Sequence, residues 1–207
     1  MRGALDCADY LWRKGDFHGA CSVFHTAHTK FVVRQNINTV PLEDVERFFF
    51  DGGDKFLTFA GNSKAGSEAR ISAAARAEIF FTAYINWYSS LTADQIDKLP
   101  DDGRIRSVMR HFGNALVAQN RRNDVHNQYL NTFGRAAQFG PDAIGLWEDV
   151  LKQIYGAPGA DSSADVKEVW REFGEFIIDW ANVPGMLKDA PRERFVKRGK
   201  RIIESCS

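Results

Sequence analysis

The chain has 207 residues, of which 27 are basic and 27 acidic, so its formal net charge is zero. That balance argues against a dedicated nucleic-acid coat and against a polybasic membrane binder. Hydrophobic residues make up 44% of the sequence, which suffices for the core of one large domain or two small ones. The longest apolar runs fall far short of the roughly 18 residues that a membrane span needs, so we expect no membrane-spanning helix.

The N-terminal segment and the cysteines indicate the cellular compartment in which we expect the protein. The N-terminal segment lacks the unbroken apolar stretch and the cleavage site of a secretory signal. Three cysteines occur, at positions 7, 21 and 206, and an odd, small number is typical of proteins from reducing compartments. We therefore expect a cytoplasmic protein, or one from another reducing intracellular compartment.

Residues 4–33 show the clearest helical pattern in the chain. Two runs with apolar residues at helical spacing are joined at Gly15 and Asp16. Gly15 can adopt the left-handed conformation that closes a helix, and Asp16 is then placed to cap the next one. Small residues such as Ala8 and Ala20 allow the two helices to approach closely. The pattern predicts a tight helical hairpin.

The same segment resembles a single tetratricopeptide (TPR) hairpin, and the resemblance implies a close-packed pair of helices. Val32 and Val33 stand near the place where the family usually has a proline, and no second copy follows at the family's period of about 34 residues. We therefore expect one TPR-like hairpin rather than an array. The residues that carry the likeness are Ala4, Ala8, Leu11, Gly15, Asp16, Phe17, Ala20, Phe24 and Ala27.

The remainder of the first half is typical of further helices separated by turns. Pro41 is suited to open a short helix, which we expect to end at Gly52-Gly53. The segment 54–60 is too short to assign to helix or strand. Ser67 can cap the longest helical pattern, which runs to Leu91 with apolar stripes wide enough for a central place in the fold. Residues 92–95 fit a capping box that opens a short helix.

The second half continues the helical pattern. One helix is expected from about residue 104 and either continues past Asn120–Asn123 or breaks there. Another begins at Pro141, and an amphipathic helix leads to Trp180. The basic tail is expected to form a short helix at most. Since no segment alternates at period two, the sequence predicts an all-α fold, a helical bundle or irregular array of about eight helices.

The Gly/Ala/Ser-rich segment 156–163 is the best candidate for a linker. It indicates a compact helical domain over residues 1–155 and a C-terminal helical arm over residues 164–207. The arm either extends from the domain or packs on it.

A short cluster of charged residues lies between two of the predicted helices. Arg121 is followed after four residues by His126. This spacing resembles the R-x4-6-H motif of HEPN-domain ribonucleases, an all-α family in which the Arg and His act together on an RNA phosphodiester, typically in a dimer. The resemblance implies metal-independent RNA cleavage, with Arg121 stabilising phosphate charge and His126 transferring protons. Arg122 follows the motif Arg, and a solvated helix boundary explains the same residues without catalysis.

Aromatic and basic residues after the linker are candidates for partner binding. An aromatic stripe on the amphipathic helix would suit docking on another chain, although the same stripe would serve equally as core. Arginines of the tail would contact an acidic protein surface or RNA, unless they only form a solvated helix face. The candidate residues are Trp170, Phe173, Trp180, Arg194, Arg198 and Arg201.

No phosphate-binding, catalytic or metal-binding motif stands out, so we expect no cofactor and no metal. The leading hypothesis is a non-enzymatic helical protein that binds a protein partner or itself, as a scaffold, adaptor or subunit of a larger assembly. Two alternatives remain open. One is a HEPN-like ribonuclease using Arg121 and His126, and the other is a helical nucleoprotein or coat subunit that contacts RNA through residues 104–122 and the basic tail.

Overall fold

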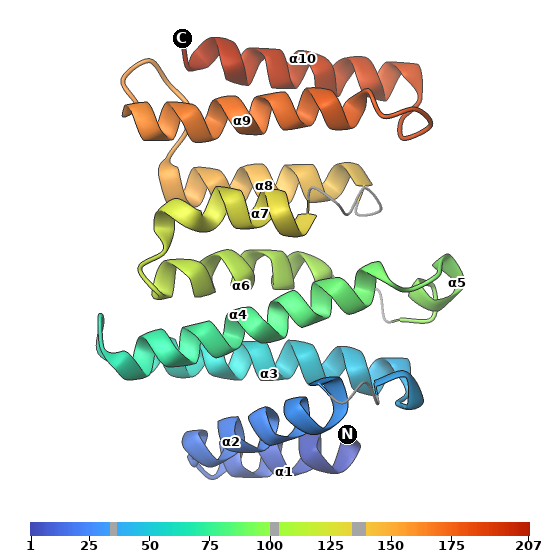
Figure 1. Ribbon diagram of the computed structural model, residues 1–207, viewed down its shortest axis with the longest axis vertical. Helices are drawn as coiled ribbons and strands as arrows, with labels where there is room; N and C mark the ends of the chain where they lie inside the picture. Colours follow the sequence, from blue (N-terminus) through green and yellow to red (C-terminus); the bar gives the residue numbers. More distant parts are fainter. Residues whose placement is uncertain (34–36, 100–103, 134–139) are drawn as a thin grey trace. The chain divides into compact units, whose positions relative to one another are not determined.

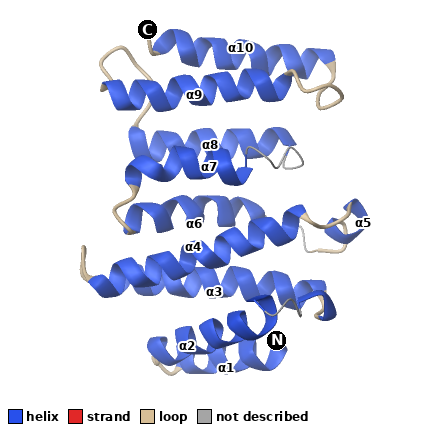
Figure 2. Ribbon diagram, in the orientation of Figure 1, coloured by secondary structure: helices blue, strands red, loops and turns tan. Residues whose placement is uncertain are grey.

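The computed structural model describes residues 1–33, 37–99, 104–133 and 140–207. Within these residues the chain is helical and contains no strand (Figure 2). The chain divides into two compact units, an N-terminal unit, Met1–Arg122, and a C-terminal unit, Asn123–Ser207. Each unit has its own buried aromatic side chains.

The helices of the two units are labelled in Figure 1. The N-terminal unit contains α1 (Arg2–Arg13), α2 (Phe17–His28), α3 (Leu42–Asn62), α4 (Glu68–Ser89), α5 (Ala93–Ile96) and α6 (Arg104–Ala118). The C-terminal unit contains α7 (Val125–Phe133), α8 (Gly140–Tyr155), α9 (Ala164–Ala181) and α10 (Asp189–Ser205).

The predicted all-α class is confirmed, but the predicted number of about eight helices is too low. Ten α-helices lie in the described residues. One reason is the basic tail, which forms a helix of 17 residues instead of a short one. Another is a break between α6 and α7, which the sequence left open. Asn120 has a φ of 62°, and the amide of Arg121 donates to the carbonyl of Leu116 at 3.0 Å, which closes α6.

The predicted hairpin at the N-terminus is formed by α1 and α2. Gly15 has a φ of 82°, and the amide of Asp16 donates to the carbonyl of Leu11 at 3.0 Å, so α1 ends in the left-handed turn expected from the sequence. An oxygen of the Asp16 carboxylate accepts from the amide of Gly19 at 2.8 Å and caps α2. Ala8 and Ala20 are fully buried at the contact between the two helices.

The predicted end of a helix at Gly52-Gly53 is wrong, because α3 runs through both glycines to Asn62. The reason is the tertiary packing of α3 against α4. A Cβ on Gly52 would lie 2.5 Å from Cε1 of Phe80, and one on Gly53 would lie 2.4 Å from Cε1 of Phe81. The two glycines therefore let the aromatic rings of α4 pack directly against the backbone of α3. Close packing with α4 outweighs the low helix propensity of glycine.

A buried polar network joins three helices of the N-terminal unit. The carboxylate of Glu46 in α3, which is 2% exposed, accepts from the hydroxyl of Tyr84 in α4 at 3.1 Å. Its other oxygen accepts from the guanidinium of Arg104 in α6 at 2.8 Å. Burial and the neighbouring carboxylate raise the pKa of Tyr84, so this hydroxyl stays protonated as a donor. The network therefore joins α4 and α6 to α3 through the carboxylate of Glu46.

The C-terminal unit is built on Trp147 of α8. Its ring lies 5.1 Å from that of Phe173 and 4.7 Å from that of Phe176, both in α9. The ring of Tyr129 in α7 lies 5.9 Å from it on another side. The segment 156–163, predicted to be a linker between a domain and an arm, therefore lies inside this unit, whereas the boundary between the two units falls at Arg122 and Asn123.

We expect Gly53→Ala to destabilise the protein, because the added methyl group would overlap the buried ring of Phe81. Overpacking of this kind costs roughly 1–3 kcal/mol, more than the roughly 1 kcal/mol that alanine gains over glycine in helix propensity. Gly61→Ala is the matched control in the same helix, since nothing lies within 4 Å of its added Cβ. Urea unfolding followed by circular dichroism should show a lower midpoint for the first variant only. Equal midpoints would show that Phe81 moves aside freely.

Candidate functional site

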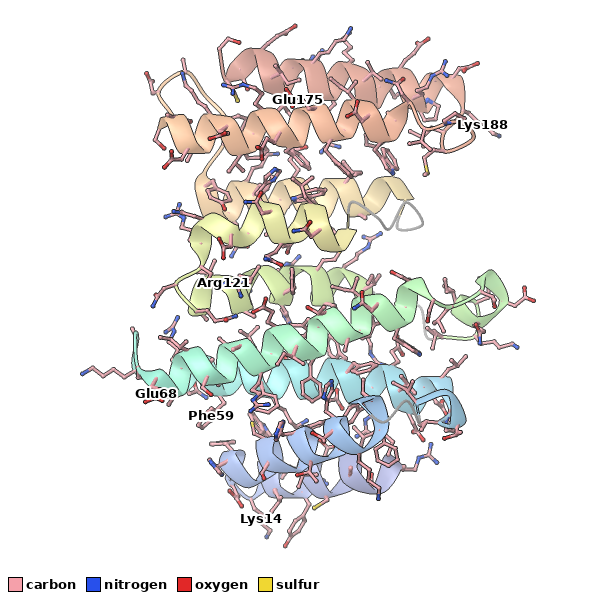
Figure 3. All side chains as sticks on the ribbon, viewed as in Figure 1. Lys14, Phe59, Glu68, Arg121, Glu175 and Lys188 are labelled. Carbon is pink, nitrogen blue, oxygen red and sulfur yellow. The ribbon has the colours of Figure 1, made fainter. Side chains whose placement is uncertain are left out.

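The C-terminal unit carries a groove of about 390 Å³ that we call the basic groove. Four of its residues are cationic and all four come from α10, whose start is marked by Lys188 in Figure 3. The lining residues are Pro158, Arg194, Lys197, Arg198, Arg201, Ile202 and Ser205.

Helical geometry explains why the cations share one surface. Arg194, Lys197, Arg198 and Arg201 lie at positions i, i+3, i+4 and i+7 of α10, and these positions face the same side of a helix. Pro158, from the segment before α9, lines the same groove. That segment is attached to α9, because the indole nitrogen of Trp170 donates to the carbonyl of Gly156 at 3.2 Å.

The position of α10 depends on a close crossing with α9. A Cβ on Gly199 of α10 would lie 2.6 Å from the carbonyl oxygen of Gly174 in α9, so only glycine fits there. The rings of Trp180 and Phe195 lie 5.2 Å apart in an edge-to-face contact farther along the two helices. Because this packing fixes the rotation of α10, it also determines which of its side chains line the basic groove.

One of the four cations has an internal partner. The guanidinium of Arg198 forms an ion pair with the carboxylate of Glu148 in α8, which is 8% exposed. The same carboxylate is 2.6 Å from Nζ of Lys152. By contrast, Arg194, Lys197 and Arg201 have no carboxylate partner among the residues that the structure describes. Arg198 thus connects α10 to α8, and three cations remain available to a ligand.

The structure separates the six residues predicted to bind a partner. Arg194, Arg198 and Arg201 meet in the basic groove. Trp170, Phe173 and Trp180 are at most 6% exposed and pack inside the C-terminal unit. The tail pattern alone did not single out Pro158, Lys197 or Glu148. The signal for Lys197 was its spacing of three residues from Arg194, whereas the other two are found only through tertiary contacts.

Arg121 and His126, the two residues of the R-x4-H spacing, fall in different units. Arg121 belongs to the N-terminal unit, where its guanidinium donates to both carboxylate oxygens of Glu78 at 2.8 and 3.0 Å. Gln119 also donates to this carboxylate at 2.8 Å. Arg121 therefore connects the end of α6 to α4.

His126 belongs to the C-terminal unit and is 1% exposed. Its ring lies 5.8 Å from that of Trp147. Nε2 is 3.1 Å from a carboxylate oxygen of Glu172, but the two groups are not aligned for a hydrogen bond. Burial therefore dominates and lowers the pKa of His126 to about 4, which keeps the imidazole neutral at pH 7. A general acid that is mostly neutral and buried is poorly placed for proton transfer to a bulky substrate.

Comparison with protein-family models, with curated proteins and with solved structures found no match. In the part of the chain that the structure describes, no group of three or more His, Cys, Asp or Glu side chains is arranged to hold a metal ion. None of the helices described there combines the length and the apolarity needed to cross a membrane.

We expect His126 to make the C-terminal unit sensitive to acid. Below pH 6.5 the unfolded chain binds a proton that the folded His126 does not, so stability falls as the pH drops toward the folded-state pKa of about 4. The difference between these two pKa values corresponds to roughly 3 kcal/mol. His126→Leu should remove this part of the pH dependence in urea unfolding measured between pH 7 and 4. The exposed His18→Leu is the control, and an unchanged slope in the His126 variant would contradict the assignment.

Proposed function

We propose that this chain is a non-enzymatic helical protein that acts through contacts, as a scaffold or a subunit of a larger assembly. The basic groove of the C-terminal unit would be its contact surface for an acidic segment of a protein partner. The observation that carries the proposal is the set of unpaired cations Arg194, Lys197 and Arg201 on one face of a helix whose position is fixed by packing.

The lining of the groove favours a protein partner over RNA. Surfaces that bind single-stranded nucleic acid combine cations with aromatic rings on which bases stack. None of the residues lining the basic groove is aromatic, and its apolar part consists of Pro158 and Ile202. Apolar side chains of this kind suit an aliphatic residue located next to Asp or Glu in a peptide. The zero net charge of the chain also gives no general attraction for nucleic acid.

We expect the combined variant Arg194→Gln, Lys197→Gln, Arg201→Gln to bind a fluorescein-labelled 12-residue peptide rich in Glu and Leu at least tenfold more weakly than the wild type. Three charge contacts of up to about 1 kcal/mol each are lost, and 1.4 kcal/mol is a factor of ten. Fluorescence anisotropy at low salt provides the dissociation constants, and the affinity should decrease as salt is added.

The matched control removes the same charge from exposed lysines of the N-terminal unit, through Lys14→Gln, Lys64→Gln and Lys98→Gln. Equal weakening in both combined variants would show that the peptide responds to overall charge, and the proposal would fail. A 12-nucleotide single-stranded RNA is measured in parallel. Tighter binding of the RNA than of the peptide would favour the nucleoprotein alternative, and RNA cleavage that His126→Ala abolishes would favour the ribonuclease.

A further inference from the structure

A second groove, of about 380 Å³, lies in the N-terminal unit between α2, α3 and α4, and we call it the N-terminal groove. It is separate from the residues of the basic groove and involves none of the partner-binding residues predicted from the sequence. Its lining residues are His18, Cys21, Ser22, His25, Phe56, Phe59, Ala69, Ser72, Ala73 and Arg76.

The walls of the groove are two matching helix faces. Four residues of α2, from His18 to His25, and four of α4, from Ala69 to Arg76, occupy positions i, i+3, i+4 and i+7 of their helices. The two helices run in the same direction in Figure 1, and α3 contributes Phe56 and Phe59 to the apolar floor. In Figure 3 the labels of Phe59 and Glu68 mark the end of α3 and the start of α4 beside this groove. Seven residues of helix span roughly 10 Å, the length of about three extended residues.

One end of the groove is closed by contacts between α2 and α4. The guanidinium of Arg76 lies 2.8 Å from Nδ1 of His25. Because a guanidinium can only donate, Nδ1 is the acceptor in this contact. Deeper in the same contact, the ring of Phe80 lies 6.1 Å from that of Phe24 and 5.1 Å from that of His28.

Among the described residues that line the groove, Arg76 is the one with a permanent charge. Within the described residues Arg76 has the imidazole of His25 as its partner and no carboxylate, and no acidic side chain lines the groove. Burial raises the pKa of the Cys21 thiol to about 11, so this group adds no negative charge. An Arg with unused donors at the end of an apolar floor is suited to a carboxylate, which it can bind through two hydrogen bonds.

From this arrangement we propose that the N-terminal groove binds a short acidic segment of a partner protein, with one large apolar side chain against Phe56 and Phe59 and a neighbouring carboxylate on Arg76. The apolar floor suits the first group, and the guanidinium, which has no carboxylate partner among the described residues, suits the second. The length of the walls limits the segment to about three residues in the groove. The inference goes beyond the function proposed above and does not depend on the basic groove.

The test uses the full chain carrying the three glutamine substitutions of α10, so that the basic groove contributes no binding. The probe is the peptide acetyl-Asp-Leu-Phe-Glu-amide, followed by ¹⁵N chemical-shift changes of the chain. Saturable shifts are expected at the amides of Ser22, Ser72 and Arg76, in the walls of the groove. Replacing both acids of the peptide by Lys, or Leu-Phe by Ala-Ala, should weaken binding at least tenfold.

Two pairs of variants locate the site. Arg76→Gln should weaken binding of the peptide at least fivefold, whereas Arg70→Gln removes a charge from the same helix outside the groove and should have no effect. Ser72→Trp fills the groove from an exposed position and should abolish binding, whereas Asn86→Trp, also exposed on α4, should not. Circular dichroism confirms that each variant is folded.

Shifts that do not saturate, shifts that map elsewhere, or equal binding in the paired variants would overturn the proposal. So would a single-stranded oligonucleotide that shifts the same amides when the peptide does not. Because Arg194, Lys197 and Arg201 are replaced throughout, a negative result here leaves the proposal for the basic groove standing. Equally, a failure of the basic groove to bind its peptide does not affect this test.

Discussion

Where α9 crosses α10, the backbones are so close that a Cβ on Gly199 would meet the carbonyl oxygen of Gly174 at 2.6 Å. The same constraint operates in the N-terminal unit, where Gly52 and Gly53 let the rings of Phe80 and Phe81 lie against the backbone of α3. A helix held this closely cannot rotate about its axis without a clash, because the interior is packed at the density of a solid. The side chains it presents on its far side are therefore fixed in direction. Both proposed binding surfaces lie on helices that are held in this way.

A second theme is the pairing of arginines with carboxylates inside each unit. Glu46 accepts from Arg104, Glu78 from Arg121, and Glu148 pairs with Arg198. Each pair joins helices that are distant in the sequence. Removing the arginine from such a pair would leave a largely buried carboxylate without that partner. Among the cations without such a carboxylate in the described residues, Arg194, Lys197 and Arg201 line the basic groove and Arg76 lines the N-terminal groove.

The balanced charge of the whole chain hides this local asymmetry. With 27 basic and 27 acidic residues there is no net field to attract an acidic partner from a distance. Yet among the residues that the structure describes, neither groove has an acidic residue in its lining. Recognition at such sites would depend on direct contact between groups of opposite charge and on burial of an apolar side chain beside them, and would provide specificity more than a fast association rate.

The sequence by itself determined the helical class and most of the local turns. Hydrophobic spacing of 3.6 residues identified the helices, and the left-handed Gly15 and the capping side chains of Asp16 and Ser67 marked their ends, because these signals act within a few residues. Features that depend on contacts between distant segments were decided by the tertiary structure. Gly52-Gly53 has the composition of a helix end, yet it lies within α3 because aromatic rings from α4 need the space.

For the candidate sites too, the sequence determined some features and the tertiary structure determined others. The sequence offered Arg194, Arg198 and Arg201 as candidate partner-binding residues, but the carboxylate of Glu148 that pairs with Arg198 comes from another helix. An aromatic stripe on α9 has the same spacing whether it faces a core or a partner, and only packing against Trp147 decided that it is core. The N-terminal groove has no sequence signature, because its walls and floor come from three helices. Sites of that kind exist only once the helices have packed.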